Sequence, residues 1–295
     1  MTQLKDRRGA QRALYFIIAM LLFPSALRAY SLLPLSAEMA ATMPSGMAEA
    51  TIGLSYFEEM RWPAFTPAGS LQGQTLIQAP QLGFRIGAGG WAEIQASFEM
   101  IYLDEQTSAG ETHRQFGNGD ARLATKVHIV NEREILPGFA LHFGTKLPNA
   151  KRSNRLGTDD TDFWFAVVAS KDLGPLDVHA NLGILLLGNS GSTLGDVFQA
   201  GGQDDLFTYV LAAVSKPLGE PEDGIQFRLL GELTGWNGSR FDNDRANGRV
   251  GVQLQHWVGT LFLGTSFGFV TGSENLGASV GYIYQFEPAK LFSND

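Results

Sequence analysis

Apolar and polar residues alternate along most of the chain after residue 48. In "LDVHANLGILLLG", residues 176–188, every second residue from Leu176 to Leu186 is apolar, and the residues between them begin with Asp177 and His179. This period of two predicts a β-strand with one apolar and one polar face. The pattern leaves open whether the apolar face meets a protein core, as in a soluble sandwich, or lipid around a polar lumen, as in an outer-membrane barrel.

Similar segments recur along the chain, and we expect about twelve strands. They lie near 49–60, 76–88, 91–102, 120–130, 139–147, 162–172, 176–188, 205–216, 225–236, 246–257, 260–270 and 278–286. Short connections alternate with long ones such as 104–119, 148–160 and 189–204. This alternation is typical of short periplasmic turns and long extracellular loops. It favours a single transmembrane antiparallel β-barrel, an all-β fold, over a secreted sandwich or a soluble barrel.

The first thirty residues have the layout of a secretory signal. A basic run from Lys5 to Arg12 precedes the apolar run "ALYFIIAMLLF", and "PSALRAYS" follows, with Ala29 as the last residue before cleavage. The apolar run is shorter than the ~20 residues that a spanning helix needs, which favours a signal peptide over a membrane anchor. We therefore predict a signal peptide at 1–29, an N-terminal segment at 30–48, the barrel at 49–286 and a tail at 287–295.

The N-terminal segment at 30–48 contains Met39, Met43 and Met47 at four-residue intervals. This spacing predicts a short helix. The segment is either a loose periplasmic tail or a plug inside the barrel, where flexible thioether side chains suit varied apolar ligands.

Composition excludes several function classes. The chain has 22 Lys and Arg against 30 Asp and Glu, and loss of residues 1–29 would leave a net charge of −12. Such acidity argues against a nucleic-acid partner. The absence of cysteine excludes disulfides, thiolate metal sites and a cysteine nucleophile. Trp91, Trp236 and Trp257 fall at strand ends, where the aromatic girdles of membrane barrels lie.

The polar faces of the predicted strands define a charged lumen lining. It consists of Arg85, Glu93, Glu99, Arg122, Lys126, His128, His142, Lys146, Asp177, His179, Asn181, Arg228, Glu232 and Arg249. A lumen of about twelve strands with this lining should be narrow and selective. Its charges either brace the barrel or guide a solute, and the basic excess among them predicts a mildly cationic lumen that favours anions.

Other patterns carry weaker chemical signals. "GTSFG" at 264–268 fits a serine nucleophile motif on Ser266, but it lies within a strand with no helix after it. An enzyme acting on lipid would need a serine beside the outward-facing His256, and the sequence shows none there. His128, His142 and His179 could meet at a metal, although polar lining is the preferred interpretation.

Two acidic loops faintly resemble calcium sites. They are "GTDDTD", with Asp159, Asp160 and Asp162, and "DNDRANG", with Asp242, Asp244 and Asn247. The second loop lacks the ligand spacing of the 12-residue calcium loop, and solvated loop tips are the preferred interpretation. We therefore predict no metal, no cofactor and no catalysis.

Three stretches carry a family pattern: "NGDARLATKVHI", "HFGTKLPNAKRSNRLGTDDTDFWFAVVASKDLGPLDVHANLG" and "VSKPLG". They resemble the outer-membrane transporter family named for the meta-cleavage pathway of phenol degradation. The chain departs from that pattern at "LGTDDTD", where a glycine is common, and at "KLPNA", where "KLPTG" is common. The resemblance implies a barrel that passes hydrophobic or aromatic compounds.

These observations together predict a bacterial outer-membrane channel for small hydrophobic or aromatic solutes, in contact with membrane lipid and lipopolysaccharide. Two alternatives remain. One is a structural or interaction barrel that transports nothing, and the other is a barrel enzyme that acts on lipid.

Overall fold

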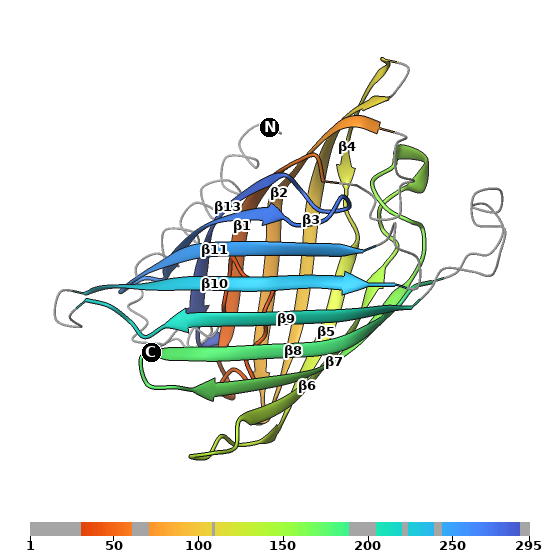
Figure 1. Ribbon diagram of the computed structural model, residues 1–295. Helices are drawn as coiled ribbons and strands as arrows, with labels where there is room; N and C mark the ends of the chain where they lie inside the picture. The colour runs from red at the N-terminus through yellow and green to blue at the C-terminus, as the bar shows by residue number, and fades with distance from the viewer. Residues whose placement is uncertain are drawn as a thin grey trace, which may run out of the picture.

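The computed structural model describes residues 31–60, 71–107, 110–188, 205–219, 224–238 and 244–289, and its strands form one closed antiparallel sheet (Figure 1). The strands are β1 (Ala48–Glu58), β2 (Leu71–Ala88), β3 (Ala92–Thr107), β4 (Thr112–Asn118), β5 (Ala121–Val130), β6 (Gly138–Leu147), β7 (Asp162–Asp172), β8 (Leu176–Leu186), β9 (Leu206–Ser215), β10 (Ile225–Asn237), β11 (Arg245–His256), β12 (Thr260–Gly268) and β13 (Leu276–Phe286). The signal peptide predicted at 1–29 lies outside the described residues, as does most of the predicted tail.

The barrel closes through β1, which pairs with both β13 and β2. β2 then pairs with β3, whose two halves have different partners on their other side. Met100–Gln106 pairs with β4, and Ala92–Ser97 pairs with β5. β4 and β5 therefore share one position in the wall, which has twelve positions. The predicted antiparallel barrel of about twelve strands is confirmed.

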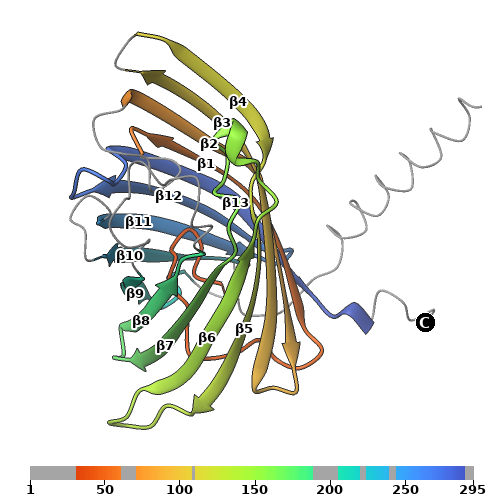
Figure 2. The same ribbon diagram turned by 90° about the vertical axis from the view of Figure 1, so that its right-hand side faces the viewer.

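The expectation of a long loop at 104–119 is wrong. β3 continues to Thr107, and β4 pairs with it in register from Met100↔Asn118 to Gln106↔Thr112. The hairpin of β3 and β4 projects beyond the rest of the wall (Figures 1 and 2). Its exposed Arg114 and Asp104 form an ion pair of 2.9 Å. β4 is exposed along most of its length, so it needs no apolar face, and its sequence shows no apolar alternation.

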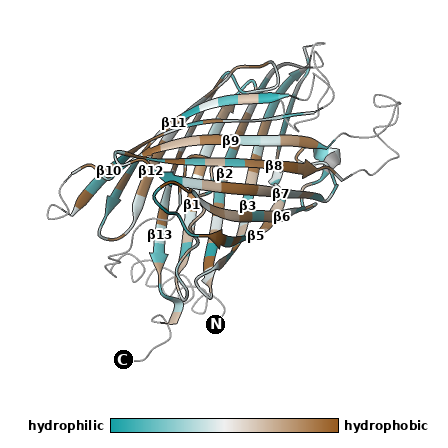
Figure 3. Cartoon of the chain, turned by 60° about the horizontal axis from the view of Figure 1, so that its bottom comes forward, coloured by the Kyte–Doolittle hydropathy of each residue, from teal (hydrophilic) through white to brown (hydrophobic). Residues whose placement is uncertain are grey.

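Apolar side chains cover the outside of the barrel, and polar side chains line its inside. Along β8, Leu182 is 53% exposed, whereas His179 is 4% exposed. Apolar and polar residues alternate along most of the strands (Figure 3). A closed barrel with an apolar exterior and a polar interior is the arrangement of a transmembrane barrel. No helix in the described ranges is long and apolar enough to span a bilayer.

One end of the barrel has tight turns. Between β2 and β3, Gly89 and Gly90 both have positive φ, at 63° and 77°, the conformation that a two-residue hairpin with matching twist requires. Trp91 and Trp257 lie at this end, with 59% and 58% of their surface exposed. Trp236 does not belong to such a girdle, because it has the inward phase of Glu232 on β10 and stacks on the guanidinium of Arg245 at 4.6 Å.

Candidate functional site

Residues 31–47, which we call the lumen segment, lie inside the barrel and contact its inner wall. At the start of the segment, the Gln253 amide donates hydrogen bonds to the carbonyls of Ser31 and Leu33, at 3.0 and 2.7 Å. The Glu232 carboxylate then accepts bonds from the Ser36 hydroxyl and the Ala37 backbone N–H, both at 2.7 Å. These bonds fix the segment across β10 and β11.

Wall side chains also bind the backbone of the next part of the segment, toward β1. The backbone N–H of Glu38 donates to Asn181 Oδ1 at 2.7 Å, and Asn181 Nδ2 donates back to the Glu38 carbonyl at 2.9 Å. Farther on, Ser170 accepts from the Ala40 N–H at 2.8 Å, and Glu93 accepts from the Met43 N–H at 2.7 Å. Wall side chains thus satisfy the backbone of the segment without making it a strand of the sheet.

Apolar contacts and two glycines complete the fit. Leu32, Leu35 and Ala37 pack on β9 and β10 against Ala212, Val214 and Leu230. A Cβ on Gly264 would lie 2.3 Å from Pro34 Cγ, and a Cβ on Gly87 would lie 2.1 Å from the Pro44 carbonyl oxygen. The wall therefore has no side chain where the segment passes closest. The expected helix through Met39, Met43 and Met47 is wrong, because backbone bonds from the segment go to the wall.

A charge network anchors the middle of the segment. The Glu38 carboxylate accepts two bonds from Arg85, at 2.7 and 3.0 Å, and one from Lys126 at 3.0 Å. Lys126 also lies 3.1 Å from Glu93, and Arg85 lies 3.7 Å from Glu49. The Lys126 side chain is 1% exposed. Removing one partner from such a network would leave a buried charge without compensation.

The structure distributes the fourteen predicted lining residues over several places on the inner wall. Arg85, Glu93 and Lys126 belong to the charge network, while Asn181, Glu232 and His128 bind the lumen segment directly. His179 bonds to Ser170 at 2.8 Å and so supports the contact to Ala40. Arg249 pairs with Glu232 at 3.5 Å.

Other predicted lining residues lie away from the segment. Lys146 pairs with Asp162 at 2.6 Å near the far end of β6, and Asp177 pairs with Lys216 at 2.5 Å at the end with the tight turns. Arg228 is half-buried on β10, in the phase of Glu232. Glu99, Arg122 and His142 line a cavity.

The sequence interpretation missed several carboxylates. Glu38, Glu49, Asp120, Asp162 and Glu274 are all buried. Those that face the lumen offset the expected excess of basic side chains. One sequence signal pointed to a covered inner wall: β9 is apolar on both faces, so something apolar had to cover the inner one.

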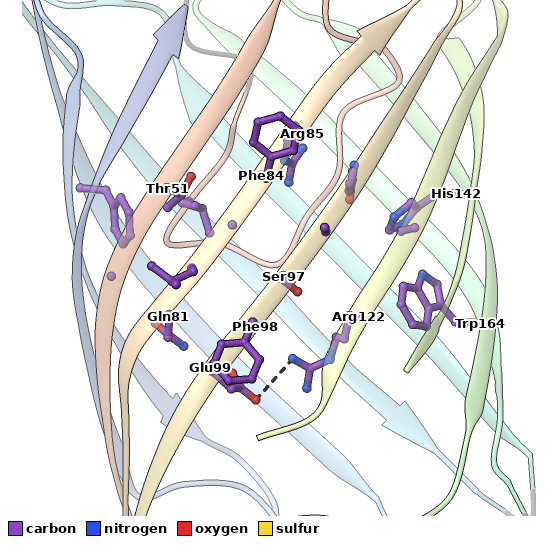
Figure 4. Close-up of a pocket in the computed structure, with 18 residues that line it drawn as sticks. Thr51, Gln81, Phe84, Arg85, Ser97, Phe98, Glu99, Arg122, His142 and Trp164 are labelled. Atoms are coloured by element: carbon purple, nitrogen blue, oxygen red, sulfur yellow. Dashed lines mark hydrogen bonds and ion pairs between the residues drawn. The ribbon is translucent and has the colours of Figure 1, made fainter. Parts of the chain in front are cut away.

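The cavity has a volume of about 340 Å³ and lies within the lumen (Figure 4). Its inward-facing side chains come from seven strands and the lumen segment. They are Leu33, Thr51, Gln81, Arg85, Gln95, Ser97, Glu99, Arg122, Ala124, His142, Trp164 and Phe262. Arg122 and Glu99 form an ion pair at 3.4 Å across the cavity wall.

The loop between β6 and β7, residues 148–161, folds against the inner face of β3. Its Ala150 and Leu156 are buried in a cluster with Ile101 and Leu103, which follow Glu99 on the inner face of β3. The Ala150 N–H donates to Asp120 at 2.9 Å. The loop thus covers β3 beyond Glu99, which lines the cavity.

The remaining candidate chemistry has other partners. Ser266 faces the lumen side and donates to Glu274 at 2.7 Å. His256 lies 3.2 Å from the Tyr282 hydroxyl. His142 packs edge-on against Trp164, while His128 and His179 bind separate groups. Within the described residues no cluster of three or more His, Cys, Asp or Glu side chains could hold a metal. Asp242 lies outside them.

Comparison with known proteins shows likeness in structure. The chain is 14% identical to the COG4313 outer membrane channel from Pseudomonas putida F1, with a TM-score of 0.61 over 84% of this chain and 98% of that one. The NanC porin aligns with a TM-score of 0.46 and 11% identity over 80% and 98% of the two chains. The translocator domain of the autotransporter NalP from Neisseria meningitidis has a TM-score of 0.46 and 12% identity over 81% and 87%.

No family model and no curated protein matches the sequence. The resemblance to the phenol meta-cleavage family therefore stays a prediction. The closed barrel, its apolar exterior and the likeness to the Pseudomonas structure agree on the class of the molecule. This protein is an outer-membrane β-barrel.

Proposed function

We propose that the protein is a gated channel for small hydrophobic or aromatic solutes, in which the lumen segment holds the passage closed. The observation that carries the proposal is how the segment is held. Its backbone binds wall side chains such as Glu232, Asn181 and Glu93, and its backbone bond to a strand lies at its last residue, where the Met47 carbonyl accepts from the Gly87 N–H at 2.9 Å. A segment held in this way can leave the lumen while every strand pair of the wall remains.

The cavity supports a solute path on the same axis. Its lining combines the ion pair of Arg122 and Glu99 with uncharged polar side chains and with Trp164 and Phe262. Its volume falls near the lower end of ligand pockets, which span roughly 300–1,000 Å³. A solute that enters from the loop side would meet the lumen segment at Leu33 before it could pass farther.

A reversible disulfide tests the gate. The Ser36 and Thr234 hydroxyl oxygens lie 3.3 Å apart, which suits a disulfide in the double variant Ser36→Cys and Thr234→Cys. The chain has no cysteine of its own to interfere. We expect the oxidised protein in planar bilayers to lose its channel openings and to regain them with reductant. Each single-cysteine variant is the control, and its conductance should be the same under oxidising and reducing conditions.

Equal conductance of the oxidised and reduced double variant would contradict gating by the segment. A parent and a reduced variant that both lack any conductance or solute uptake would contradict the channel itself. That result would favour the alternative of a structural barrel, whose ion pairs brace a closed wall.

A further inference from the structure

The cavity beside the lumen segment presents positive charge. The Arg122 side chain is 40% exposed, while the carboxylate of Glu99 that faces it is only 8% exposed. Their separation of 3.4 Å exceeds the roughly 2.7–2.9 Å of a strong charge-assisted hydrogen bond. A guanidinium carries five N–H donors in a planar fork, so Arg122 retains donors that can point into the cavity.

The second guanidinium of the cavity is already engaged. Arg85 binds both oxygens of Glu38, at 2.7 and 3.0 Å, and its side chain is 18% exposed. The pair of Arg85 and Glu38 also shows the geometry in which this lumen binds a carboxylate, with two parallel N–H bonds to one group. Arg122 is therefore the side chain with room for a carboxylate from outside the protein.

The rest of the cavity suits a ring. Trp164 on β7 and Phe262 on β12 supply aromatic faces, and Leu33 adds an apolar contact from the lumen segment. Thr51, Gln81 and Ser97 are uncharged and can hydrogen-bond ring substituents. Figure 4 shows Arg122 and Trp164 on neighbouring parts of the wall, with Ser97 and Glu99 beside them on β3.

From this arrangement we infer that the cavity is a binding site for a small aromatic carboxylate. Arg122 binds the carboxylate, and Trp164 with Phe262 contacts the ring. The volume of about 340 Å³ admits one ring with its carboxylate. This inference rests on the proposed channel function, because it names the solute class for the same lumen.

Calorimetric titration of the purified full-length mature protein in detergent tests the site with three probes: benzoate, its uncharged analogue benzyl alcohol, and acetate. We expect benzoate to bind at one site and both other probes to bind at least about tenfold more weakly. Benzyl alcohol lacks the carboxylate that forms the charge-assisted bond, and acetate lacks the ring that makes the aromatic contacts. Equal binding of benzoate and benzyl alcohol, or no binding of benzoate, would overturn the inference. So would equal binding of benzoate and acetate, since the ring would then contribute nothing.

Two substitutions locate the site. Arg122→Gln should weaken benzoate by about tenfold and leave benzyl alcohol unchanged. The matched control is Arg114→Gln, which also removes an arginine from an ion pair, but on the exposed β4 hairpin. It should bind benzoate like the parent. Undiminished benzoate binding by Arg122→Gln would overturn the assignment.

A third variant keeps the test decisive if Arg122→Gln does not fold. Glu99→Gln removes the carboxylate that competes for Arg122 and retains the shape of the side chain. It should bind benzoate several-fold more tightly than the parent, and an unchanged or weaker affinity would count against the site. Benzoate uptake into liposomes separates the two proposals. Binding without uptake would support the site and contradict the channel. Uptake without binding would support the channel and contradict the site.

Discussion

At the scale of single residues, the direction of a side chain decides whether it meets lipid or the lumen. Leu182 and His179 lie three positions apart on β8, and their exposures differ by more than tenfold. Because successive side chains of a strand point to opposite faces, this phase extends to every residue of the strand.

A charge at Leu182 should therefore impair folding into the membrane. An arginine on the lipid face costs roughly 2–4 kcal/mol near the middle of the bilayer. We expect Leu182→Arg to unfold from lipid vesicles at clearly lower urea concentration than the parent, as seen by loss of the heat-modifiable band on a gel. Leu182→Met keeps the surface apolar and should behave like the parent. Unfolding of the arginine variant at the parental urea concentration would show that this face does not meet lipid.

Glu38 should control how firmly the lumen is closed. In Glu38→Gln, Arg85 and Lys126 lose the carboxylate they share, and Lys126 remains buried with Glu93. Breaking a buried ion pair costs about 3–5 kcal/mol, and the remaining contact with Glu93 places the effect at the lower end. We expect more frequent openings in single-channel recordings. Glu58→Gln, an exposed residue at the end of β1, is the control. Unaltered opening frequency in Glu38→Gln would show that the network does not hold the gate.

At the scale of elements, the inner faces of particular strands are shaped to receive the lumen segment. β9 presents Ala212 and Val214 inward, where other strands present charges. On β11 and β12, Gly251 and Gly264 lie directly opposite each other, and Pro34 lies over both. The outer faces of these strands therefore contact lipid, while their inner faces contact the lumen segment.

Adding a methyl group at this crossing should displace the segment. The new Cβ of Gly264→Ala would lie 2.3 Å from Pro34 Cγ, so the segment must move. We expect faster cleavage of residues 31–47 by added protease and a higher conductance. Gly231→Ala is the matched control, because a Cβ at this strand glycine meets nothing within 4 Å. If the two variants behave alike, the close approach of Pro34 has no role in closing the lumen.

At the scale of the whole molecule, the wall is complete without the segment. β1 pairs with β13 from Ala48↔Phe286 to Glu58↔Leu276, and it pairs with β2 on its other side. The segment ends where β1 begins. Its contacts therefore close the lumen of a barrel that the strands already form without it.

A chain that starts at Met47 after its signal should therefore still fold. We expect a normal heat-modifiable band, a lower unfolding midpoint and a permanently larger conductance than the parent. The full-length chain expressed in parallel is the control. If the shortened chain fails to form a barrel, the segment is part of the folding core, and it is not a removable gate.

Processing of the exported chain gives a separate test. We expect the mature protein in the outer-membrane fraction, with an N-terminus near Tyr30 by N-terminal sequencing. Intact Met1 in the inner-membrane fraction would contradict both the predicted signal peptide and the proposed transport.

The sequence by itself determined the barrel. Strand alternation is a local property of period two, and loop lengths can be counted along the chain, so the number of strand positions in the wall, their apolar faces and the two kinds of barrel end were all predictable. The hairpin of β3 and β4 was not, because β4 is exposed along most of its length and needs no apolar face.

Only the tertiary structure decided what fills the lumen. The bonds that hold the segment join residues as far apart in the chain as Met43 and Glu93 or Ser31 and Gln253. The alternation of apolar and polar residues along a strand carries no information about such distant pairs. Glu38 therefore looked like an ordinary charge in a tail, and its role emerged only when barrel closure brought Arg85 and Lys126 to the same point.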